Sequence, residues 1–372
     1  MRIAFLCKRR YMGKDVIADR YGRLYEIPRQ LALYGHEVRG YCLDYHGAGR
    51  GAWSHGAAPG TLTWESVSVS LLRTPALAAS PSRLLRRIRG YKPDVLIGAS
   101  DIPHAVLAEW LSRKLQRPCV VDLYDNFESF GQARIPFFKT LLARAVQRAD
   151  LVTAVTEPLI SKAVNSYKRT GETLLLPNAV DPSMFYPGER ASARMRLKLP
   201  AESILIGTAG YLARMKGLAP LYAAWPQIER SLPDAHLVLA GPIDSRMPPP
   251  TGPRVHYLGK LPSERVATLF NALDLGVITL LDDDFGRFCS PQKAYEMLAC
   301  GLPFVSAAVG SMTRLLRDSP ARLYRPDDAD DLARTIVDQL ASPVPMHVSA
   351  ADWASRVSKL NHALQSLQRS RL

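Results

Sequence analysis

A serine, a lysine and a glutamate occur close together near the C-terminal third of the chain, and their order suggests an anion-binding helix. Ser290–Pro291 precedes an apolar segment that carries Lys293 and Glu296 and ends at Cys300–Gly301. Serine and proline are common at helix starts, where free N–H groups and the positive end of the helix dipole attract anions. Lys293 adds a full charge one turn later, so the pattern predicts a phosphate-type site. The plain alternative is a surface helix with a serine cap.

Two further groups of polar side chains follow strands expected in the first half of the chain. The loop 8–23 after the first strand carries six basic residues, namely Lys8, Arg9, Arg10, Lys14, Arg20 and Arg23. The strand expected at 119–124 ends in a second group, which comprises Asp122, Tyr124, Asp125, Asn126 and Glu128. Ligands of parallel α/β sheets bind at the carboxyl ends of the strands. Both groups are therefore candidate binding residues, although solvated loops and strand-end caps have similar compositions.

The elements that must position these residues alternate between strand and helix. A strand at 2–6, a helix at 24–34 and a strand at 37–43 form a β–loop–α–β unit, which is the opening unit of a doubly wound parallel sheet. We expect residues 47–75 to be irregular and residues 134–150 to form a basic amphipathic helix. That helix either covers the sheet or lies on an anionic membrane surface.

A proline-rich segment divides the chain into two such α/β halves. Residues 177–187 contain three prolines together with Asn and Asp, a composition typical of a linker. After it, a strand at 204–207, the glycine-bearing loop Gly210–Gly217 and a helix at 219–231 begin a second set. A chain of 372 residues is also too long for one core. We therefore predict an α/β fold with two Rossmann-like domains, residues 1–177 and 178–349, and a last helix in 350–372.

The composition and the net charge of the chain limit the kinds of partner and the cellular location that we expect. Residues 1–177 carry 26 basic and 15 acidic side chains, against 22 and 19 in the remainder, so the excess of +14 belongs mainly to the first half. Such a surface attracts phosphates, an anionic membrane face or nucleic acid, or it serves solubility alone. The five cysteines show no paired spacing and no apolar run is long enough to span a bilayer. We expect a cytoplasmic protein, with the inner face of the cell membrane as a candidate docking surface.

Four motifs in a fixed order resemble a retaining GT-B glycosyltransferase of family 4 (glycosyl transferases group 1). They are Gly35–Val38, Pro177–Asp181 with Phe185, the loop Gly210–Gly217 with Lys216, and Glu296–Pro303. The resemblance implies two facing Rossmann-like domains, of which the first binds the acceptor and the second binds a nucleotide sugar. It also implies that the last helix returns to the first domain. No metal or other cofactor is implied, and the His and Cys residues of the sequence form no ligand cluster.

The resemblance also assigns residues to roles. Lys216 and Arg214, supported by the helix start at Ser290–Pro291, would stabilise the charge of the departing nucleoside diphosphate, and Glu296 would hold the ribose hydroxyls. The nucleotide-sugar site would further include Gly210, Tyr211, Gly217, Lys293, Asp284 and Phe288. The acceptor site would include Gly13, Arg20, Arg23, Asp122, Tyr124 and Asp125. No protein base is required if the departing phosphate takes the acceptor's proton.

The chain departs from the family pattern at three positions that touch the sugar or the diphosphate. Phe288 stands where relatives commonly have the first of two glutamates, and Asp284 is the nearest substitute carboxylate. Tyr211 replaces the arginine that often follows the first glycine of the loop, so Arg214 is expected to supply that charge. Tyr124 replaces a histidine in the first domain. The departures thus concern mainly the sugar half of the site, whereas the nucleotide half keeps Lys216 and Glu296 of the family pattern.

The function expected from these features is transfer of a hexose from a UDP- or GDP-linked donor to a glycan, a lipid-linked or a small-molecule acceptor in polysaccharide or glycoconjugate biosynthesis. Two alternatives remain open at this point. A GT-B-like sugar-nucleotide epimerase would need more acids and histidines in its cleft than the sequence offers. A polyanion- or nucleic-acid-binding protein would suit the net charge, but the basic residues are not interleaved with aromatic ones and no DNA-binding motif is present.

Overall fold

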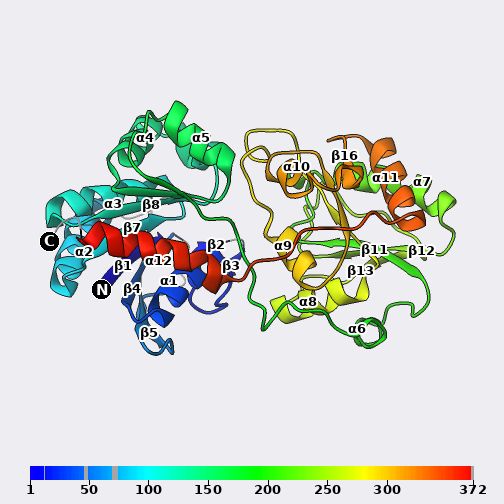
Figure 1. The fold of residues 1–372 in the computed structure, drawn as a ribbon, viewed down its shortest axis with the longest axis horizontal. Helices are drawn as coiled ribbons and strands as arrows, with labels where there is room; N and C mark the ends of the chain where they lie inside the picture. Colours follow the sequence, from blue (N-terminus) through cyan, green and yellow to red (C-terminus); the bar gives the residue numbers. More distant parts are fainter. Residues whose placement is uncertain (12, 46–48, 69–73, 370–372) are drawn as a thin grey trace. The chain divides into compact units, whose positions relative to one another are not determined.

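The computed structural model describes residues 1–11, 13–45, 49–68 and 74–369, and these residues form two compact α/β units (Figure 1). The N-terminal unit comprises Met1–Asn178 together with Trp353–Leu372, and the C-terminal unit comprises Ala179–Asp352. Each unit has its own sheet, so each is described by itself below. The structure confirms the predicted fold class of two Rossmann-like units.

The described residues of the N-terminal unit include a mostly parallel sheet of eight strands in the order β10-β9-β8-β7-β1-β4-β6-β5. The strands are β1 (Arg2–Lys8), β4 (Glu37–Asp44), β5 (Gly51–His55), β6 (Thr61–Ser68), β7 (Val95–Ala99), β8 (Cys119–Leu123), β9 (Leu151–Ala154) and β10 (Thr173–Leu175). β5 pairs antiparallel with β6, and the other pairs are parallel. A two-stranded hairpin, β2 (Arg10–Tyr11) and β3 (Lys14–Asp15), interrupts the loop after β1.

The prediction that residues 47–75 are irregular is wrong where the structure describes them. They contain β5, β6 and the start of α2, while residues 47, 48 and 69–73 lie outside the described residues. β6 alternates buried and more exposed side chains, with Leu62 and Trp64 facing the core. This period of two is the ordinary signature of a half-buried strand. Trp64 lies opposite Gly40 of β4, where a Cβ atom would come 2.1 Å from the indole ring.

Helices cover both faces of this sheet, and the last helix of the chain is one of them. They are α1 (Arg23–Leu33), α2 (Thr74–Tyr91), α3 (Ile102–Leu115), α4 (Phe138–Arg148), α5 (Glu157–Asn165) and α12 (Trp353–Arg369), with short turns η1 (Phe127–Ser129) and η2 (Gly131–Arg134). α12 lies beside α1 (Figure 1). The Tyr34 hydroxyl donates to the Ala354 carbonyl at 2.9 Å, and the His36 ring contacts the Asn361 amide oxygen at 2.6 Å.

In the C-terminal unit, the described residues form a fully parallel sheet of six strands in the order β13-β12-β11-β14-β15-β16. Its strands are β11 (Ile204–Ala209), β12 (Ala235–Ala240), β13 (Val255–Tyr257), β14 (Leu275–Ile278), β15 (Phe304–Ala307) and β16 (Leu323–Tyr324). The helical elements are α6 (Arg190–Leu197), η3 (Arg214–Lys216), α7 (Ala219–Ser231), α8 (Ser263–Ala272), α9 (Gln292–Ala299), α10 (Ser311–Leu315), η4 (Pro320–Arg322) and α11 (Ala329–Ala341).

Each sheet contains a point at which the strand order reverses direction. In the N-terminal unit this point lies between β1 and β7, and in the C-terminal unit it lies between β11 and β14. Ligands of doubly wound sheets bind over the carboxyl ends of the strands at such points. Among the described residues, no helix is long and apolar enough to cross a bilayer. All five cysteines are buried and free of disulfides.

Candidate active site

Two glycines at the reversal point of the C-terminal sheet bring β11 and β12 into close contact. Gly210 follows β11 and Gly241 follows β12, and both have a φ of 133°. A Cβ atom on Gly241 would lie only 1.7 Å from the Gly210 carbonyl oxygen. The left-handed backbone and the close approach both require glycine here. The glycine pair thus keeps side chains away from the carboxyl end of β11, where a ligand would enter.

The loop after Gly210 places Lys216 across the reversal point, at the end of β14. Gly217 has a φ of 72°, and a Cβ atom there would lie 2.9 Å from the Leu280 carbonyl carbon. The Thr279 hydroxyl donates to the Lys216 carbonyl at 2.8 Å. The Lys216 ammonium lies 4.0 Å from the centroid of the Phe285 ring, a distance typical of a cation–π contact. Lys216 is therefore fixed at its backbone and rests on an aromatic ring.

A second lysine reaches the same point from α9. The Lys293 ammonium donates to the Thr208 hydroxyl of β11 at 3.1 Å. It would also lie 3.9 Å from a Cβ atom on Gly210. Burial lowers the pKa of Lys293 to about 8, and the positive charge of Lys216 acts in the same direction. Among the described residues, neither ammonium has a carboxylate within ion-pairing distance. The site therefore concentrates positive charge that a bound anion would neutralise.

The start of α9 differs in detail from the sequence prediction. Pro291, and not Ser290, is the residue that precedes the helix, and no side chain caps it. The Ser290 hydroxyl instead contacts the Tyr295 hydroxyl at 3.1 Å. The residue at the cap position is therefore the proline, whereas the plain alternative from the sequence had placed a serine there. The helix N-terminus still lies on the same element as Lys293, so its dipole adds to the local positive potential.

Glu296 lies one turn after Lys293 on the same face of α9 and is only 4% exposed. Its negative charge acts to raise the pKa of Lys293, against the larger effect of burial. Arg214 and Tyr211 are exposed on the loop that carries Lys216. The structure therefore brings Lys216, Lys293 and Glu296 into one electrostatically coupled group, and leaves Arg214 and Tyr211 at its surface.

The acidic loop before α9 is held mainly by Asp282 and Asp283. Asp283 accepts hydrogen bonds from the N–H groups of Phe285 and Gly286, and Asp282 pairs with Arg287 at 2.7 Å. Asp284 is exposed next to Phe285, and Phe288 is half-buried. Thr208 and Phe285 were not among the predicted site residues. Thr208 ends a buried strand, and its position at the carboxyl end is the signal that could have found it.

In the N-terminal unit, two of the predicted acceptor residues form a buried ion pair instead. Arg23 is 0% exposed and binds Asp122 through Nε–Oδ2 at 2.8 Å and Nη2–Oδ1 at 2.6 Å. Arg23 also donates to the Leu176 carbonyl, and Thr153 donates to Asp122. Arg23 and Asp122 thus bind each other and neighbouring groups of the unit, which favours a structural role for the pair, and their contact with an acceptor stays a prediction.

The reversal point of this sheet instead carries Lys8, Tyr124 and Asp125. Lys8, the last residue of β1, donates from its ammonium to the Tyr124 hydroxyl at 2.9 Å, and from its backbone N–H to Ser100. Burial lowers the pKa of Lys8, whereas Asp101 and Asp125 act to raise it. Lys8 was one of six basic residues in its loop, and only its place at the strand end distinguishes it. A half-buried cation beside two carboxylates and a phenol can bind sugar hydroxyl groups.

The remaining predicted acceptor residues do not gather with this group. Gly13 is exposed at the turn of the β2–β3 hairpin with a φ of 75°, and Arg20 is exposed with a φ of 50°. Arg9 of the same loop packs inward, where it pairs with Asp15 at 2.8 Å and lies over the Trp53 ring. Some positive side chains of this loop therefore make structural contacts, and others are exposed to solvent.

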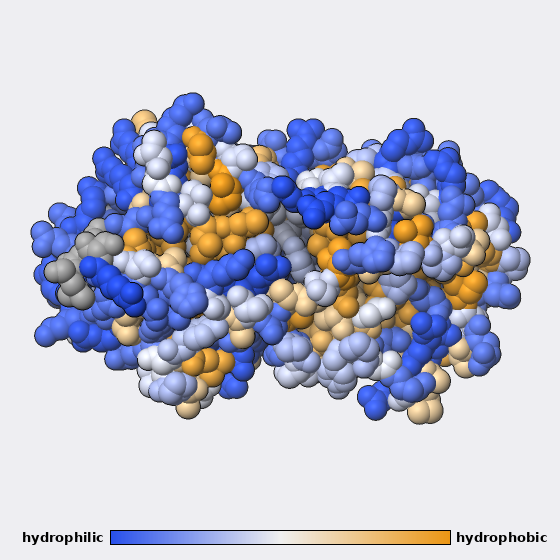
Figure 2. All heavy atoms as spheres, in the orientation of Figure 1, coloured by the Kyte–Doolittle hydropathy of each residue, from blue (hydrophilic) through white to orange (hydrophobic). Residues whose placement is uncertain are grey.

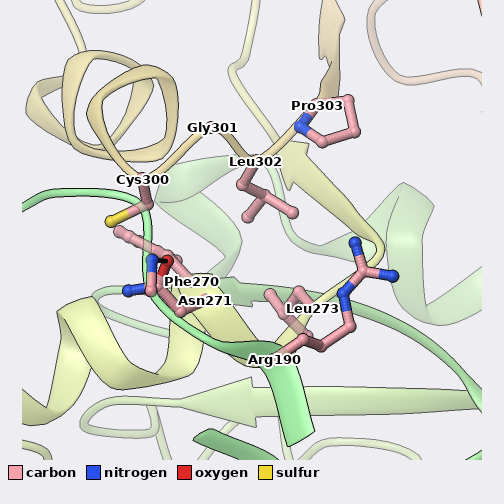
Figure 3. Close-up of a pocket in the computed structure, with 9 residues that line it drawn as sticks. Arg190, Phe270, Asn271, Leu273, Cys300, Gly301, Leu302 and Pro303 are labelled. Carbon is pink, nitrogen blue, oxygen red and sulfur yellow. Dashed lines mark hydrogen bonds between the residues drawn. The ribbon is translucent and has the colours of Figure 1, made fainter.

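A cavity of about 360 Å³ in the C-terminal unit lies away from these groups (Figure 3). It is lined by Gly188, Arg190, Phe270, Asn271, Leu273, Cys300, Gly301, Leu302 and Pro303. Leu273 and Pro303 come just before β14 and β15, so the cavity is at the amino ends of the strands. Arg190 pairs with Asp274, and Asn271 bonds the backbone of Tyr186 and Gly188. Its polar side chains thus have structural partners.

Comparisons with known proteins identify the family. Residues 23–179 match the family model described as a glycosyl transferase 4-like domain, and residues 203–342 match the model described as glycosyl transferases group 1. Together the two matches span most of the chain. The chain belongs to the group 1 glycosyltransferases. Among the described residues, no cluster of His, Cys, Asp and Glu has the arrangement of a metal site.

Curated relatives of this glycosyltransferase include D-inositol 3-phosphate glycosyltransferases. The protein from Stackebrandtia nassauensis is 26% identical over 238 residues, which cover 59% of this chain and 51% of the relative. The protein from Mycolicibacterium gilvum is 28% identical over 239 residues, which cover 58% and 52%. The matches thus span about half the length of the curated relatives.

Solved structures show the same GT-B fold over the whole chain. Sucrose-phosphate synthase from Thermosynechococcus elongatus superposes with a TM-score of 0.70 at 19% identity, and covers 100% of this chain and 97% of that one. Anabaena HepE, solved in complex with UDP, superposes with a TM-score of 0.68 at 17% identity, covering 100% and 98%. At these identities the likeness concerns the fold.

Proposed function

We propose that this glycosyltransferase transfers a hexose, with retention of anomeric configuration and without a metal ion, from a UDP- or GDP-linked donor to an acceptor hydroxyl. The observation that carries the proposal is the convergence of Lys216 and Lys293 at the reversal point of the C-terminal sheet. Two ammonium groups without a carboxylate partner among the described residues form a ready site for a diphosphate. HepE structures solved with UDP and with UDP-glucose support UDP as the nucleotide and glucose as the sugar.

The chemistry of the leaving group explains why two lysines are needed. Negative charge builds on the nucleoside diphosphate as the glycosidic bond breaks, and it must be met by cations or by N–H groups. Lys216 contributes one charge from the loop after β11, and Lys293 contributes another from α9. Two nearby cations can supply the charge that a divalent metal supplies in other transferases, so we propose no cofactor besides the donor itself.

The neighbouring groups take complementary roles in this proposal. Glu296 accepts hydrogen bonds from the ribose hydroxyls, and the start of α9 contacts the second phosphate. Phe288 and Asp284 lie on the loop that would meet the sugar. In the N-terminal unit, Lys8 takes the place that Arg23 had in the prediction, and acts with Tyr124 and Asp125 on the acceptor.

The acceptor in this proposal is a glycan, a lipid-linked sugar or a polyol, made on the cytoplasmic side of the membrane during polysaccharide or glycoconjugate synthesis. The name of the inositol 3-phosphate relatives supports a polyol among these. The basic surface of the N-terminal half, with +11 of the +14 total charge, suits an acceptor that carries phosphate.

Donor turnover and nucleotide affinity test the proposal directly. The purified chain is incubated with a panel of UDP- and GDP-sugars, and nucleoside diphosphate release is measured with and without simple glycoside acceptors. Lys216→Ala is expected to weaken UDP binding at least about tenfold, since it removes a charge contact to phosphate.

A matched variant, Arg230→Ala, serves as the control. Arg230 is exposed in the last turn of α7, which ends just before the amino end of β12, so its loss should leave the UDP affinity within about twofold. If no sugar nucleotide is consumed, and Lys216→Ala binds UDP and GDP as well as the parent protein does, the proposed function is wrong.

A further inference from the structure

Large apolar side chains are exposed in the segment that leads into α4. Phe137 is 79% exposed, Ile135 is 47% exposed and Phe130 is 36% exposed, with Pro136 between two of them also exposed. These four residues are called the apolar tip below. Phe137 has a φ of 66°, a left-handed conformation that is unusual for a bulky residue. Phe137 thus combines an uncommon backbone conformation with a side chain that is mostly exposed to solvent.

The helix that follows the apolar tip carries only positive charge on its exposed side. α4 buries Leu142, Ala145 and Val146 against the unit. Its exposed residues include Lys139, Arg144 and Arg148, and Arg134 immediately precedes Ile135. Arg148 also pairs with Glu109 of α3 at 3.7 Å. The sequence from Ser129 to Arg148 contains no Asp or Glu. These four cations are called the basic face below. Figure 2 shows apolar atoms among hydrophilic ones over the part of the N-terminal unit that carries α4 and α5.

The other basic helix of this unit shows a different pattern over residues 81–91, where its side chains are described. In that part, α2 exposes Arg86, Arg87 and Arg89, and it buries Leu84 and Ile88. Within these residues α2 therefore offers charge to a partner and keeps its large apolar side chains covered or half-covered. The apolar tip and the basic face together combine exposed aromatic and aliphatic residues with a basic helix that contains no acidic residue.

We propose that the apolar tip and the basic face bind the surface of an anionic lipid bilayer. Phe137 and Ile135 would enter the boundary between headgroups and acyl chains, and the basic face would lie over the lipid phosphates. Peripheral attachment needs both apolar burial and attraction to anionic lipids, because either one alone is weak. This attachment goes beyond the proposed sugar transfer and does not depend on it.

Charge and side-chain type favour a bilayer as the partner. An acid-free stretch with four cations matches a surface of lipid phosphates. A polyanion such as nucleic acid would use the same cations but would leave Ile135 and Pro136 in water. A bilayer accommodates both components at once, with aromatic rings at the headgroup level.

Co-sedimentation with vesicles tests the proposal. The full chain is mixed with vesicles of phosphatidylcholine alone or of an equimolar phosphatidylcholine–phosphatidylglycerol mixture, and the bound fraction is measured at low and high salt. We expect binding to the anionic vesicles that salt weakens, and little binding to the neutral ones. The double variant Ile135→Ser, Phe137→Ser should bind anionic vesicles at least about tenfold more weakly. The double variant Lys139→Gln, Arg144→Gln should lose about tenfold as well.

Two matched controls separate this surface from general hydrophobicity and net charge. Met195→Ser removes an exposed apolar side chain from α6 of the C-terminal unit. Lys359→Gln with Arg369→Gln removes two exposed charges from α12, which packs with α1 on the other face of the sheet from α4. Both controls should bind within about twofold of the parent protein, since neither removes a residue of the apolar tip or of the basic face.

The proposal is overturned if the parent protein binds neither vesicle, if it binds both equally, or if the Ile135→Ser, Phe137→Ser variant binds like the parent. Circular dichroism and UDP affinity report whether each variant is folded, and the charge variant tests the same surface should the apolar one unfold. A parent protein that turns over donor but ignores vesicles removes the membrane proposal alone. A protein that binds vesicles but no nucleotide removes the proposed function alone.

Discussion

The pKa of Lys293 makes the affinity for UDP depend on pH in a way that can be calculated. Burial and the charge of Lys216 hold this pKa at about 8, below the ordinary lysine value. A bound diphosphate favours the charged ammonium and should return the pKa to about 10.4, the usual value for lysine. The free site must then take up a proton as it binds UDP at alkaline pH. The affinity therefore falls as the pH rises through the lower pKa.

The size of the effect follows from the two pKa values. Between pH 7 and pH 9, the protonated fraction of Lys293 in the free protein falls about tenfold, whereas in the complex it hardly changes. The dissociation constant for UDP should therefore rise about tenfold over this interval. Calorimetric titrations in two buffers with different ionisation enthalpies measure both the constant and the number of protons taken up.

Variants decide whether Lys293 is the titrating group. Lys293→Gln should bind UDP weakly and with no pH dependence between pH 7 and 9. Lys216→Gln should also bind weakly, but its remaining pH dependence should move to higher pH, because Lys216 lowers the pKa of Lys293. The reasoning is refuted if the parent protein shows a flat affinity over this range, or if Lys293→Gln retains the slope.

Three further substitutions test the packing of the N-terminal unit and the surroundings of Lys216. Asp122→Asn should destabilise the fold by about 3–5 kcal/mol in urea unfolding, because it leaves the Arg23 guanidinium buried without its counter-charge. Gly40→Ala should lower the melting temperature by several degrees, since its methyl group would overlap an indole ring of the neighbouring strand; a melting temperature equal to that of the parent would contradict this. Phe285→Leu should weaken UDP binding about threefold to tenfold, because it removes the ring on which Lys216 rests, and an unchanged affinity would assign the ring no positioning role.

Much of the fold follows from the pattern of the sequence, because parallel strands buried on both faces appear as short apolar runs between helices. The helix predicted at 219–231 is α7, with the same bounds. The errors fall where this signal is weak. β6 mixes Thr, Glu and Ser with its two core residues, and α6 is a short helix of eight residues in which polar and apolar side chains are mixed. Neither carries a continuous apolar run.

The sequence indicated which residues lie near the candidate site, but it did not indicate which charged side chains pair with each other. The glycine loop and the helix after Ser290–Pro291 pointed to Lys216, Lys293 and Glu296. These three residues come together because α9 packs close to the end of β11. Arg23 and Asp122 stand 99 residues apart, and each looked like a binding residue at a sheet edge. A cation and a carboxylate at a sheet edge can bind a ligand, or they can form an ion pair with each other. Only the three-dimensional structure distinguishes these two possibilities.

The path of the chain between the two units affects how the protein can be made. The C-terminal unit is one continuous segment, Ala179–Asp352, inserted between two parts of the N-terminal unit. During synthesis, the segment 1–178 leaves the ribosome without the helix that covers His36 and Tyr34, and it must wait for the whole insert before α12 exists. Domains otherwise tend to complete in N-to-C order as they are synthesised. Expressed fragments should behave accordingly, with 179–352 able to fold as a separate piece and 1–178 exposing the surface that α12 covers.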